Sequence, residues 1–557
     1  MKLSSMIVMG LTLVVAFLVI YPIFMLLFGS FMGGPPGAGA GFSLKGYEKA
    51  YFSPETYRIL LTTIWLSAVR AVLAMSLAIY LAWVVTRTDT PWRKGLEVLI
   101  WLKFFLPSLP LTVAWILLAG PKGFINEGLS RLFHLEEPVF NIFSYGGIIW
   151  VSTISWVAML FILITPAFRG MDAALEESSR MSGASSFATL RRITIPVLKP
   201  ALLGAFLLGF IRLLESFETE LFLGYGQGIY VYTTRIWWLM GITPADHPQA
   251  MALSTIFLLL VGFIIFIQWR LLGQRQYTTV TGRGFTTRPT RLGRWRYVTL
   301  ASVLLYFILA VVLPLGVLAL GSFMRVWGIF VAEPYTIKHW VRTFSDPRFA
   351  LSLRNTMLVG VGAATIGIII YGLISYIIIK TKFLVRKPLD FITWLPWGVP
   401  SLVLALGFLW AFQGGLPFLS FLFGTIWLLI LIFIVKGFPL GVRVMNGAMY
   451  QLGNELEESS RVLGASWTYT FRKIMLPLIS PAAISTWIIL FMLTARDLVT
   501  VVFLYSPQSR LLSIILFEHW LAGEYERATV VGLILTVILM ASALVARWLG
   551  TKQEVTP

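Results

Sequence analysis

A polar sequence of 21 residues occurs twice in this otherwise apolar chain. Residues 176–196 read EESSRMSGASSFATLRRITIP, and residues 457–477, which start 281 positions later, read EESSRVLGASWTYTFRKIMLP. The shared residues are carboxylates, hydroxyls and guanidinium groups, which make charged and hydrogen-bonded contacts. Neither copy contains a cysteine or a histidine. The repeat therefore favours a duplicated docking surface over a catalytic centre.

Each copy is predicted to form a helix, a turn and a second helix. Gly183 and Gly464 are placed to end the first helices, because glycine accepts the left-handed conformation common there. Ser185 and Ser466 follow at a position suited to capping the next helix. A solvated loop is the ordinary interpretation of one such segment. Two copies that keep their polar residues while neighbouring apolar residues differ instead favour docking sites for two identical partner subunits.

Composition places the chain in a membrane. Its 557 residues are 58% hydrophobic and 12% charged, where a soluble domain carries roughly 25% charged residues. Long apolar stretches, each able to cross about 30 Å of hydrocarbon, recur along the whole chain and leave no room for a sizeable soluble domain. The formal net charge of +19 lies in loops, which argues against the single basic face of a nucleic-acid binder.

Apolar runs and their breakers predict twelve spanning segments. With the N-terminus in the cytoplasm, the basic loops also face the cytoplasm, as the positive-inside rule requires. Both termini are then cytoplasmic, and the first segment is expected to be retained and not cleaved as a signal peptide. The predicted segments are 6–29, 59–85, 96–118, 145–165, 197–214, 249–271, 298–320, 355–379, 390–412, 420–442, 478–495 and 528–548.

The predicted fold class is an all-α polytopic membrane protein with two parallel, pseudo-symmetric six-helix halves. Residues 1–272 form the first half and residues 298–557 the second, in the same orientation because an even number of crossings precedes the second. Residues 273–297, rich in Gly, Thr and Arg, are expected to be a cytoplasmic linker. Repeats of this kind pack about an axis along the membrane normal with a solute path between them.

Both polar copies resemble the EAA loop of permease subunits of binding-protein-dependent ABC importers. That pattern is Glu-Ala-Ala, three residues, Gly, nine residues, Ile-x-Leu-Pro, and here the loops lie near 172–196 and 453–477. Serines replace the alanines, and Ile195 replaces one leucine. The resemblance implies a type I importer permease fold. The residues that it assigns to the coupling loops are Glu177, Ser178, Ser179, Gly183, Ala184, Pro196, Glu458, Ser459, Ser460, Gly464, Ala465 and Pro477.

The resemblance also implies how the protein works. Each loop would form a short helix in a groove of one subunit of a cytoplasmic ATPase homodimer, with Glu177 and Glu458 making charged contacts. Closure of that dimer would rock the halves between inward-facing and outward-facing states, and an extracytoplasmic binding protein would deliver the solute. The sequence has no Gly-x-x-x-x-Gly-Lys-[Ser/Thr] motif to cradle phosphates. The chain is therefore expected to be no enzyme and to bind no cofactor, with ATP on the partner.

Charged residues near the extracytoplasmic end of the fifth span of each half are candidates for the solute path or a gate, because charge at membrane depth is costly. They are Arg212, Glu215 and Glu218 in the first half and Arg496 and Asp497 in the second. Glu215 aligns with Arg496 at the 281-residue offset, which predicts opposite charges meeting across the axis. The alternative is that these residues lie at the membrane interface, bonded to headgroups and water.

Prolines are expected to break or bend the third and ninth predicted spans. They are Pro107 and Pro110 in one, and Pro396 and Pro400 in the other. Such breaks expose backbone that can line a path, or they serve helix packing. The histidines have no ligand spacing, so they are expected at the surface and no metal site is predicted: they are His134, His247, His339 and His519.

Three segments, 228–237, 277–284 and 510–535, resemble the ferric-iron importer branch of the family. This implies uptake of Fe(III), bare or with small anions. Thiamine, 2-aminoethylphosphonate and other organophosphates are alternatives, because similar fused permeases serve them. An ion-coupled secondary carrier would use midplane carboxylates and has no use for two docking loops. A membrane enzyme would need a nucleophile, base or metal constellation, and the sequence shows none.

Overall fold

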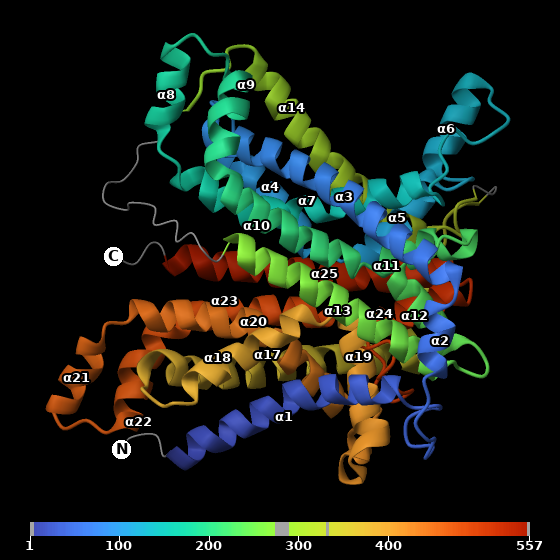
Figure 1. Ribbon diagram of the computed structural model, residues 1–557. Helices are drawn as coiled ribbons and strands as arrows, with labels where there is room; N and C mark the ends of the chain where they lie inside the picture. Colours follow the sequence, from blue (N-terminus) through green and yellow to red (C-terminus); the bar gives the residue numbers. More distant parts are fainter. Residues whose placement is uncertain (1–4, 273–288, 330–332, 554–557) are drawn as a thin grey trace. The chain divides into compact units, whose positions relative to one another are not determined.

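The computed structural model describes residues 5–272, 289–329 and 333–553, and these residues fold into helices (Figure 1). Eleven helices in the described part are long and apolar enough to cross a membrane. The number is twelve if the bent pair Arg386–Gly398 and Ser401–Gly415 counts as one span. The prediction of an all-α polytopic membrane protein with about twelve spans is confirmed.

The spanning helices overlap the predicted apolar segments. In the first half they are α1 (Ser5–Ser30), α3 (Pro54–Arg87), α5 (Ser108–Ala119) continued by α6 to Phe133, α7 (Tyr145–Gly170), α10 (Ile195–Leu214) and α13 (His247–Leu272). The third span therefore begins later than the predicted 96–118, whose first part forms the shorter helix α4 (Arg93–Phe105). In the second half they are α14 (Trp295–Phe307) followed by α15 (Leu313–Phe323), α17 (Pro347–Lys380), α18 (Arg386–Trp394) followed by α19 (Ser401–Leu409), α20 (Ile426–Gln451), α23 (Leu476–Ala495) and α25 (Tyr525–Gln553).

Shorter elements join these spans. The short α-helices are α2 (Lys45–Tyr51), α6 (Phe124–Phe133), α8 (Ala173–Met181), α9 (Ser186–Thr189), α11 (Glu218–Leu223), α12 (Tyr232–Gly241), α16 (Lys338–Phe344), α21 (Asn454–Val462), α22 (Trp467–Thr470) and α24 (Leu512–Leu521). Single π-helical turns are η1 (Leu190–Thr194), η3 (Ile308–Val312), η5 (Trp410–Gly415) and η7 (Phe471–Met475), and 3-10 turns are η2 (Tyr225–Gln227), η4 (Leu395–Gly398) and η6 (Pro417–Leu422).

Prolines interrupt the third and ninth predicted spans, as expected. Pro107 has extended backbone (ψ 139°) and separates α4 from α5. Pro400 precedes α19 in the same way, and the two arms of that span differ in direction by 107°. Proline causes such breaks because it lacks the N–H of the helix ladder and restricts the residue before it. The prediction of broken helices is confirmed, and a role in the solute path stays a prediction.

Packing divides the chain into two compact units that each combine helices from both sequence halves. Unit 1 contains Met1–Ser53, Ile236–Leu259 and Trp340–Pro557, and unit 2 contains Pro54–Arg235 and Leu260–His339. Within unit 1, α1 packs on α18 and α19, and within unit 2, α14 and α15 pack on α4 and α5. The first helix of each sequence half thus packs on the body of the other half.

Close backbone approach explains how α1 joins unit 1. A Cβ on Gly29 would lie 2.6 Å from the Trp410 ring, and a Cβ on Gly407 would lie 2.6 Å from the carbonyl oxygen of Pro22. Small residues at such contacts let membrane helices approach closely, and van der Waals packing then holds them together. A larger side chain at either glycine would separate α1 from its neighbours.

The predicted linker 273–297 is described only in part, because residues 273–288 lie outside the described residues. The remainder is tied to the end of α3. The N–H of Thr290 donates to the carbonyl of Arg87 (2.8 Å), and the N–H of Leu292 donates to Asp89 (2.8 Å). Helix α14 then begins at Trp295, inside the range predicted as linker.

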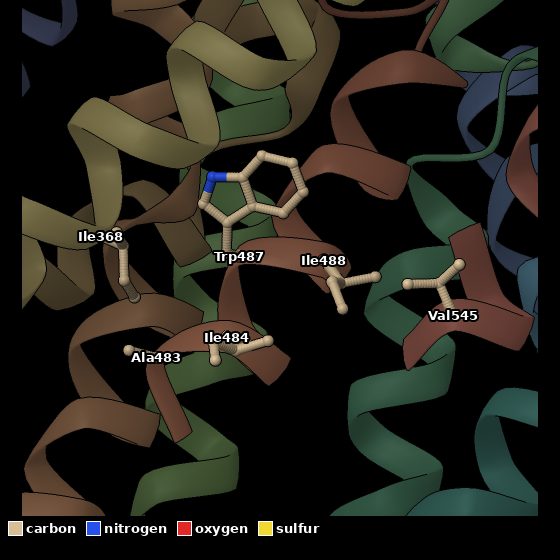
Figure 2. A pocket seen from close by; sticks show the side chains of 6 residues that line it. All are labelled: Ile368, Ala483, Ile484, Trp487, Ile488 and Val545. Carbon is tan, nitrogen blue, oxygen red and sulfur yellow. The ribbon is translucent and has the colours of Figure 1, made fainter. Parts of the chain in front are cut away.

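An apolar pocket lies between α17, α23 and α25 within unit 1 (Figure 2). Trp487 stands in its wall and donates its indole N–H to Thr365 (2.9 Å). Its lining residues are Ile368, Ala483, Ile484, Trp487, Ile488 and Val545. Recognition of a polar or ionic solute needs convergent polar groups, so this pocket is not a candidate solute site.

Candidate functional site: the repeated loops and two ion pairs

The two polar copies fold into the same helix–turn–helix, α8 with α9 and α21 with α22. In Figure 1, α8 and α21 lie beyond the ends of α10 and α23, the spanning helices that follow them. Gly183 has φ of +84° and Gly464 of +82°, so both take the left-handed conformation. Ser185 and Ser466 then accept the backbone N–H three residues on, at 3.2 and 3.3 Å. The predicted glycine stops and serine caps are confirmed.

The second serine of each motif closes the turn. Ser179 shares a hydrogen bond with Thr189 (3.1 Å), and Ser460 shares one with Thr470 (2.8 Å). The alanine of the EAA pattern has no hydroxyl for this contact. The departure from the family pattern is thus matched, in both copies, by a threonine ten residues later.

Replacing Ser179 by alanine is expected to loosen the first turn by about 1 kcal/mol, the net worth of one such hydrogen bond. Amide hydrogen exchange of the α9 residues should then rise roughly fivefold. Thr189→Ala should have the same effect, and the double variant no more than either single one. Ser178→Ala is the matched control, because the hydroxyl of Ser178 donates to the carbonyl of Ala174 within α8 (2.9 Å) and not to α9. Additive effects of the two single changes would contradict a shared bond.

A π-helical turn at the same place joins each loop to the following span. Leu190–Thr194 precedes Pro196, and Phe471–Met475 precedes Pro477. Proline cannot donate to the helix ladder, and single π turns inside α-helices are found frequently at functional sites. Both prolines are the second residues of their helices, α10 and α23.

The two glutamates at the start of each copy differ in exposure. Glu177 is partly exposed and Glu458 is exposed, whereas Glu176 is buried and Glu457 is only partly exposed. The motif carboxylates are therefore accessible to another protein, and the preceding ones face the body of their own unit. Contact between Glu177 or Glu458 and an ATPase stays a prediction.

The buried Glu176 ties the first loop to α3 and to the approach to α10, and through Arg87 to the end of α7. Arg87, the last residue of α3, donates to the carbonyl oxygens of Phe168 and Met171 at the end of α7, the latter at 2.6 Å. The same guanidinium lies 3.8 Å from Oε2 of Glu176. The other carboxylate oxygen accepts the hydroxyl of Thr194, just before α10, at 2.7 Å. One carboxylate thus bridges α8, α3 and the approach to α10.

The second loop has corresponding contacts with different donors. Lys380, the last residue of α17, donates to the carbonyl of Leu452. The hydroxyl of Tyr376, one turn earlier, donates to Oε1 of Glu457 at 3.1 Å. Both acceptors stand 281 positions after acceptors of the first loop. The position of the contacts is repeated although the donor side chains are not.

An ion pair inside unit 2 holds the break between α10 and α11. Arg70, in the middle of α3, pairs with Glu220 of α11, and their side chains are 1% and 0% exposed. The guanidinium also donates to Ser67, to Ser152 and to the carbonyl of Leu213. A desolvated pair is stable only with such additional hydrogen bonds, so this cluster is a structural centre of unit 2.

Unit 1 has an ion pair at the corresponding break, after α23. Lys436 of α20 pairs with Asp497, and its ammonium group also donates to the hydroxyl of Thr500 (2.7 Å). The Asp497 carboxylate in turn accepts the N–H of Thr500 (2.8 Å). Sequence reasoning missed Lys436 and Arg70. A single charge inside an apolar run, as in LIFIVKGFPL and LSAVRAVLAM, was the available signal.

The predicted path residues lie at these two breaks. Glu215, the residue after α10, pairs with Arg212 at 3.0 Å, and Glu218 opens α11 and accepts a serine hydroxyl from the start of α5. Arg496 is the residue after α23, next to Asp497. The structure thus gives Glu215 and Asp497 partners inside their own units. The predicted meeting of opposite charges across the two halves stays a prediction.

One histidine differs from expectation. His519 is 3% exposed, and its Nδ1 lies 2.6 Å from Oε2 of Glu524, so the surface prediction is wrong for it. The apolar helix α24 buries the ring, and the Glu524 carboxylate compensates one ring nitrogen. His134 is exposed, as predicted. In the described part of the chain, no three His, Asp or Glu residues group as a metal site.

Comparison with known protein families shows to which family a chain with these two loops belongs. The model of the family described as "Binding-protein-dependent transport system inner membrane component" matches residues 74–277 and 363–554, one stretch in each half. The chain belongs to this family. Each matched stretch contains one of the repeated loops. The permease is therefore a multi-pass transport component of the bacterial inner membrane, and systems of this family pair such a component with an ATPase and a binding protein.

Individual relatives resemble the permease at low identity. It is 25% identical over 549 residues to the ferric transport system permease protein FbpB of Actinobacillus pleuropneumoniae, covering 97% of this chain and 77% of that protein. The putative ferric transport system permease protein FbpB 1 of Haemophilus influenzae is 25% identical over 507 residues (89% and 77%). The putative 2-aminoethylphosphonate transport system permease protein PhnV of Salmonella choleraesuis is 25% identical over 268 residues (47% and 97%).

Proposed function

We propose that this permease forms the solute path of an ABC importer and couples uptake to ATP hydrolysis by a partner ATPase homodimer. The observation that carries the proposal is the duplicated helix–turn–helix, built with the same stops, caps and closing hydrogen bonds in both halves. Two equal docking elements suit two equal subunits. Glu177 and Glu458 present their carboxylates for that contact.

The proposal places both loops in the cytoplasm. Six spans separate them along the chain when the bent pair counts as one, so both emerge on the same side of the membrane. Basic residues crowd these loops, and the positive-inside rule assigns such loops to the cytoplasm. The basic residues are Arg180, Arg191 and Arg192 in the first loop and Arg461, Arg472 and Lys473 in the second. Both chain termini then also lie in the cytoplasm.

The solute path is proposed to run beside the breaks after α10 and α23. Arg212, Glu215, Glu218, Arg496 and Asp497 are assigned to its lining or gate. What supports this is the density of charge next to interrupted helices, since non-helical backbone at membrane depth needs protein or water around it. Charged residues at that depth are functional candidates by default.

The solute is proposed to be Fe(III), delivered by an extracytoplasmic binding protein. Support comes from two relatives named as ferric transport permeases, whose similarity extends through both halves of this chain. The alternative is an organic solute such as 2-aminoethylphosphonate, another organophosphate or thiamine. The similarity to the 2-aminoethylphosphonate permease supports that alternative over about half of this chain.

ATP hydrolysis by the complex of permease and ATPase in lipid tests both levels of the proposal. The binding protein is added empty, loaded with Fe(III), loaded with 2-aminoethylphosphonate or loaded with thiamine. We expect the Fe(III) form alone to stimulate hydrolysis severalfold. Stimulation by an organic form alone would keep the importer and discard iron. Failure of the permease to associate with an ATPase would overturn the coupling function.

A further inference from the structure

We propose that Glu176 and Glu457 are positioning residues that clamp each coupling loop to the end of a long membrane helix, so that a force on the loop moves that helix. A coupling loop here means α8 with α9, or α21 with α22. The proposal rests on the coupling function proposed above. It adds the contacts through which each loop acts on the membrane helices. The contacts of Glu176 with Arg87 and Thr194 are called the first joint, and those of Tyr376 with Glu457 and Phe471 the second joint.

The long helices at these joints, α3 and α17, are longer than the hydrocarbon core of the membrane is thick. Helices α3 and α17 each contain 34 residues, or about 51 Å at 1.5 Å per residue, against about 30 Å of hydrocarbon. Each therefore extends out of the membrane. Within its unit, α3 packs along α7 and α10, and α17 packs along α20 and α23. A displacement at the end of α3 is therefore transmitted to α7 and α10, the spans before and after the first coupling loop. A displacement at the end of α17 is transmitted in the same way to α20 and α23.

The first joint is buried and charged. Glu176 is 3% exposed and Arg87 is 2% exposed, so a docked protein cannot reach either group. Arg87 fixes the end of α3 to the last turn of α7, and Glu176 fixes α8 to both Arg87 and Thr194. Buried polar groups that lose a partner are costly, so the elements at this joint move together or the joint breaks.

The second joint repeats this arrangement with other chemistry. Tyr376 donates to Glu457, and its ring also contacts Phe471 of the π turn edge-on, with 6.3 Å between ring centroids. Glu457 and the π turn before α23 thus meet at one residue of α17, whereas in the first joint Thr194 of the π turn before α10 bonds to Glu176 itself. A contact required only for local packing has no reason to recur at the same place with different donors.

The first test compares Glu176→Gln and Glu457→Gln in the complex with the ATPase. Association and basal ATP hydrolysis should stay near the unsubstituted level, because the docking surface is intact. Solute taken up per ATP hydrolysed should fall about tenfold for Glu176→Gln, should fall also for Glu457→Gln, and should fall further for the double variant. Glu176→Asp should restore part of the ratio. Glu455→Gln, an exposed acid on α21, is the matched control and should change nothing.

The second test measures the joint directly and does not depend on uptake. The chain has no cysteine, so spin labels can be placed at will. The pairs are Ser76→Cys on α3 with Met181→Cys on α8 in unit 2, and Ile369→Cys on α17 with Val462→Cys on α21 in unit 1, all at exposed positions. We expect each distance to stay constant between nucleotide-free and ATP-bound complexes. In the Glu176→Gln background, the first distance should broaden and shift with nucleotide, while the second should not.

Two results would overturn the proposal: an unchanged uptake-to-ATP ratio in the double variant, or a first label distance that shifts with nucleotide in the unsubstituted protein. If Glu176→Gln loses ATPase association through misfolding, the label distances of the unsubstituted protein decide alone. Failure of the unsubstituted permease to bind any ATPase is a different outcome. It would refute the coupling function, on which the joint depends.

Discussion

Replacing Glu177 and Glu458 together by alanine is expected to abolish ATP-dependent uptake while leaving the protein inserted in the membrane. Both carboxylates are accessible on the coupling helices α8 and α21, and neither supports the fold in the way that the buried Glu176 does. Truncating one partner of a charged, hydrogen-bonded contact at an interface costs about 2–5 kcal/mol. That is a loss of at least about 30-fold in affinity at each loop.

The measurement is uptake of radiolabelled solute by proteoliposomes or cells, normalised to the amount of permease in the membrane. Each single variant should keep part of the uptake, because the other loop still docks. Glu455→Gln serves as a surface control on the same helix as Glu458. Uptake by the double variant at more than half of the unsubstituted rate would refute the assigned role of these two glutamates.

Replacing Arg70 by methionine is expected to destabilise unit 2 by about 3–5 kcal/mol, the cost of leaving one member of a buried ion pair uncompensated. The remaining Glu220 side chain is 0% exposed, and the hydrocarbon core of the membrane contains no water that could solvate its charge. The measurement is unfolding of the purified protein in detergent or nanodiscs. Purified protein should unfold at a clearly lower temperature and insert in lower amount.

Two comparisons separate this effect from mere loss of charge. Arg131→Met removes an arginine from the Glu127 pair, whose side chains are 70% and 34% exposed, and should cost under about 1 kcal/mol. Arg70→Met combined with Glu220→Gln should recover much of the loss, because removing a whole buried pair is often nearly neutral. Equal stability of Arg70→Met and Arg131→Met would show that the buried pair does not hold unit 2.

Features that depend on neighbouring residues were predictable. Apolar runs of about 20 residues must cross the membrane as helices, since only a helix satisfies its own backbone there, and the observed spans match. Prolines broke the helices where expected. The coupling loops also have the predicted helix ends and helix caps, at Gly183, Gly464, Ser185 and Ser466. Each of these effects acts within a few residues of the chain. Recognition of the family rested on the same local spacing, found twice.

Features that depend on contacts between distant segments were decided by the tertiary structure. Sequence showed that Arg70 and Lys436 are charged but not which carboxylate neutralises each, and it showed two adjacent glutamates per loop but not that one of each pair faces inward. It also placed α1 in the first half, whereas packing puts it on α18 and α19. The physical reason is that burial and pairing are properties of surfaces brought together by folding. The sequence by itself determined the spans, the repeat and the two loops, and the fold decided how each loop is fastened to the helices that it is proposed to move.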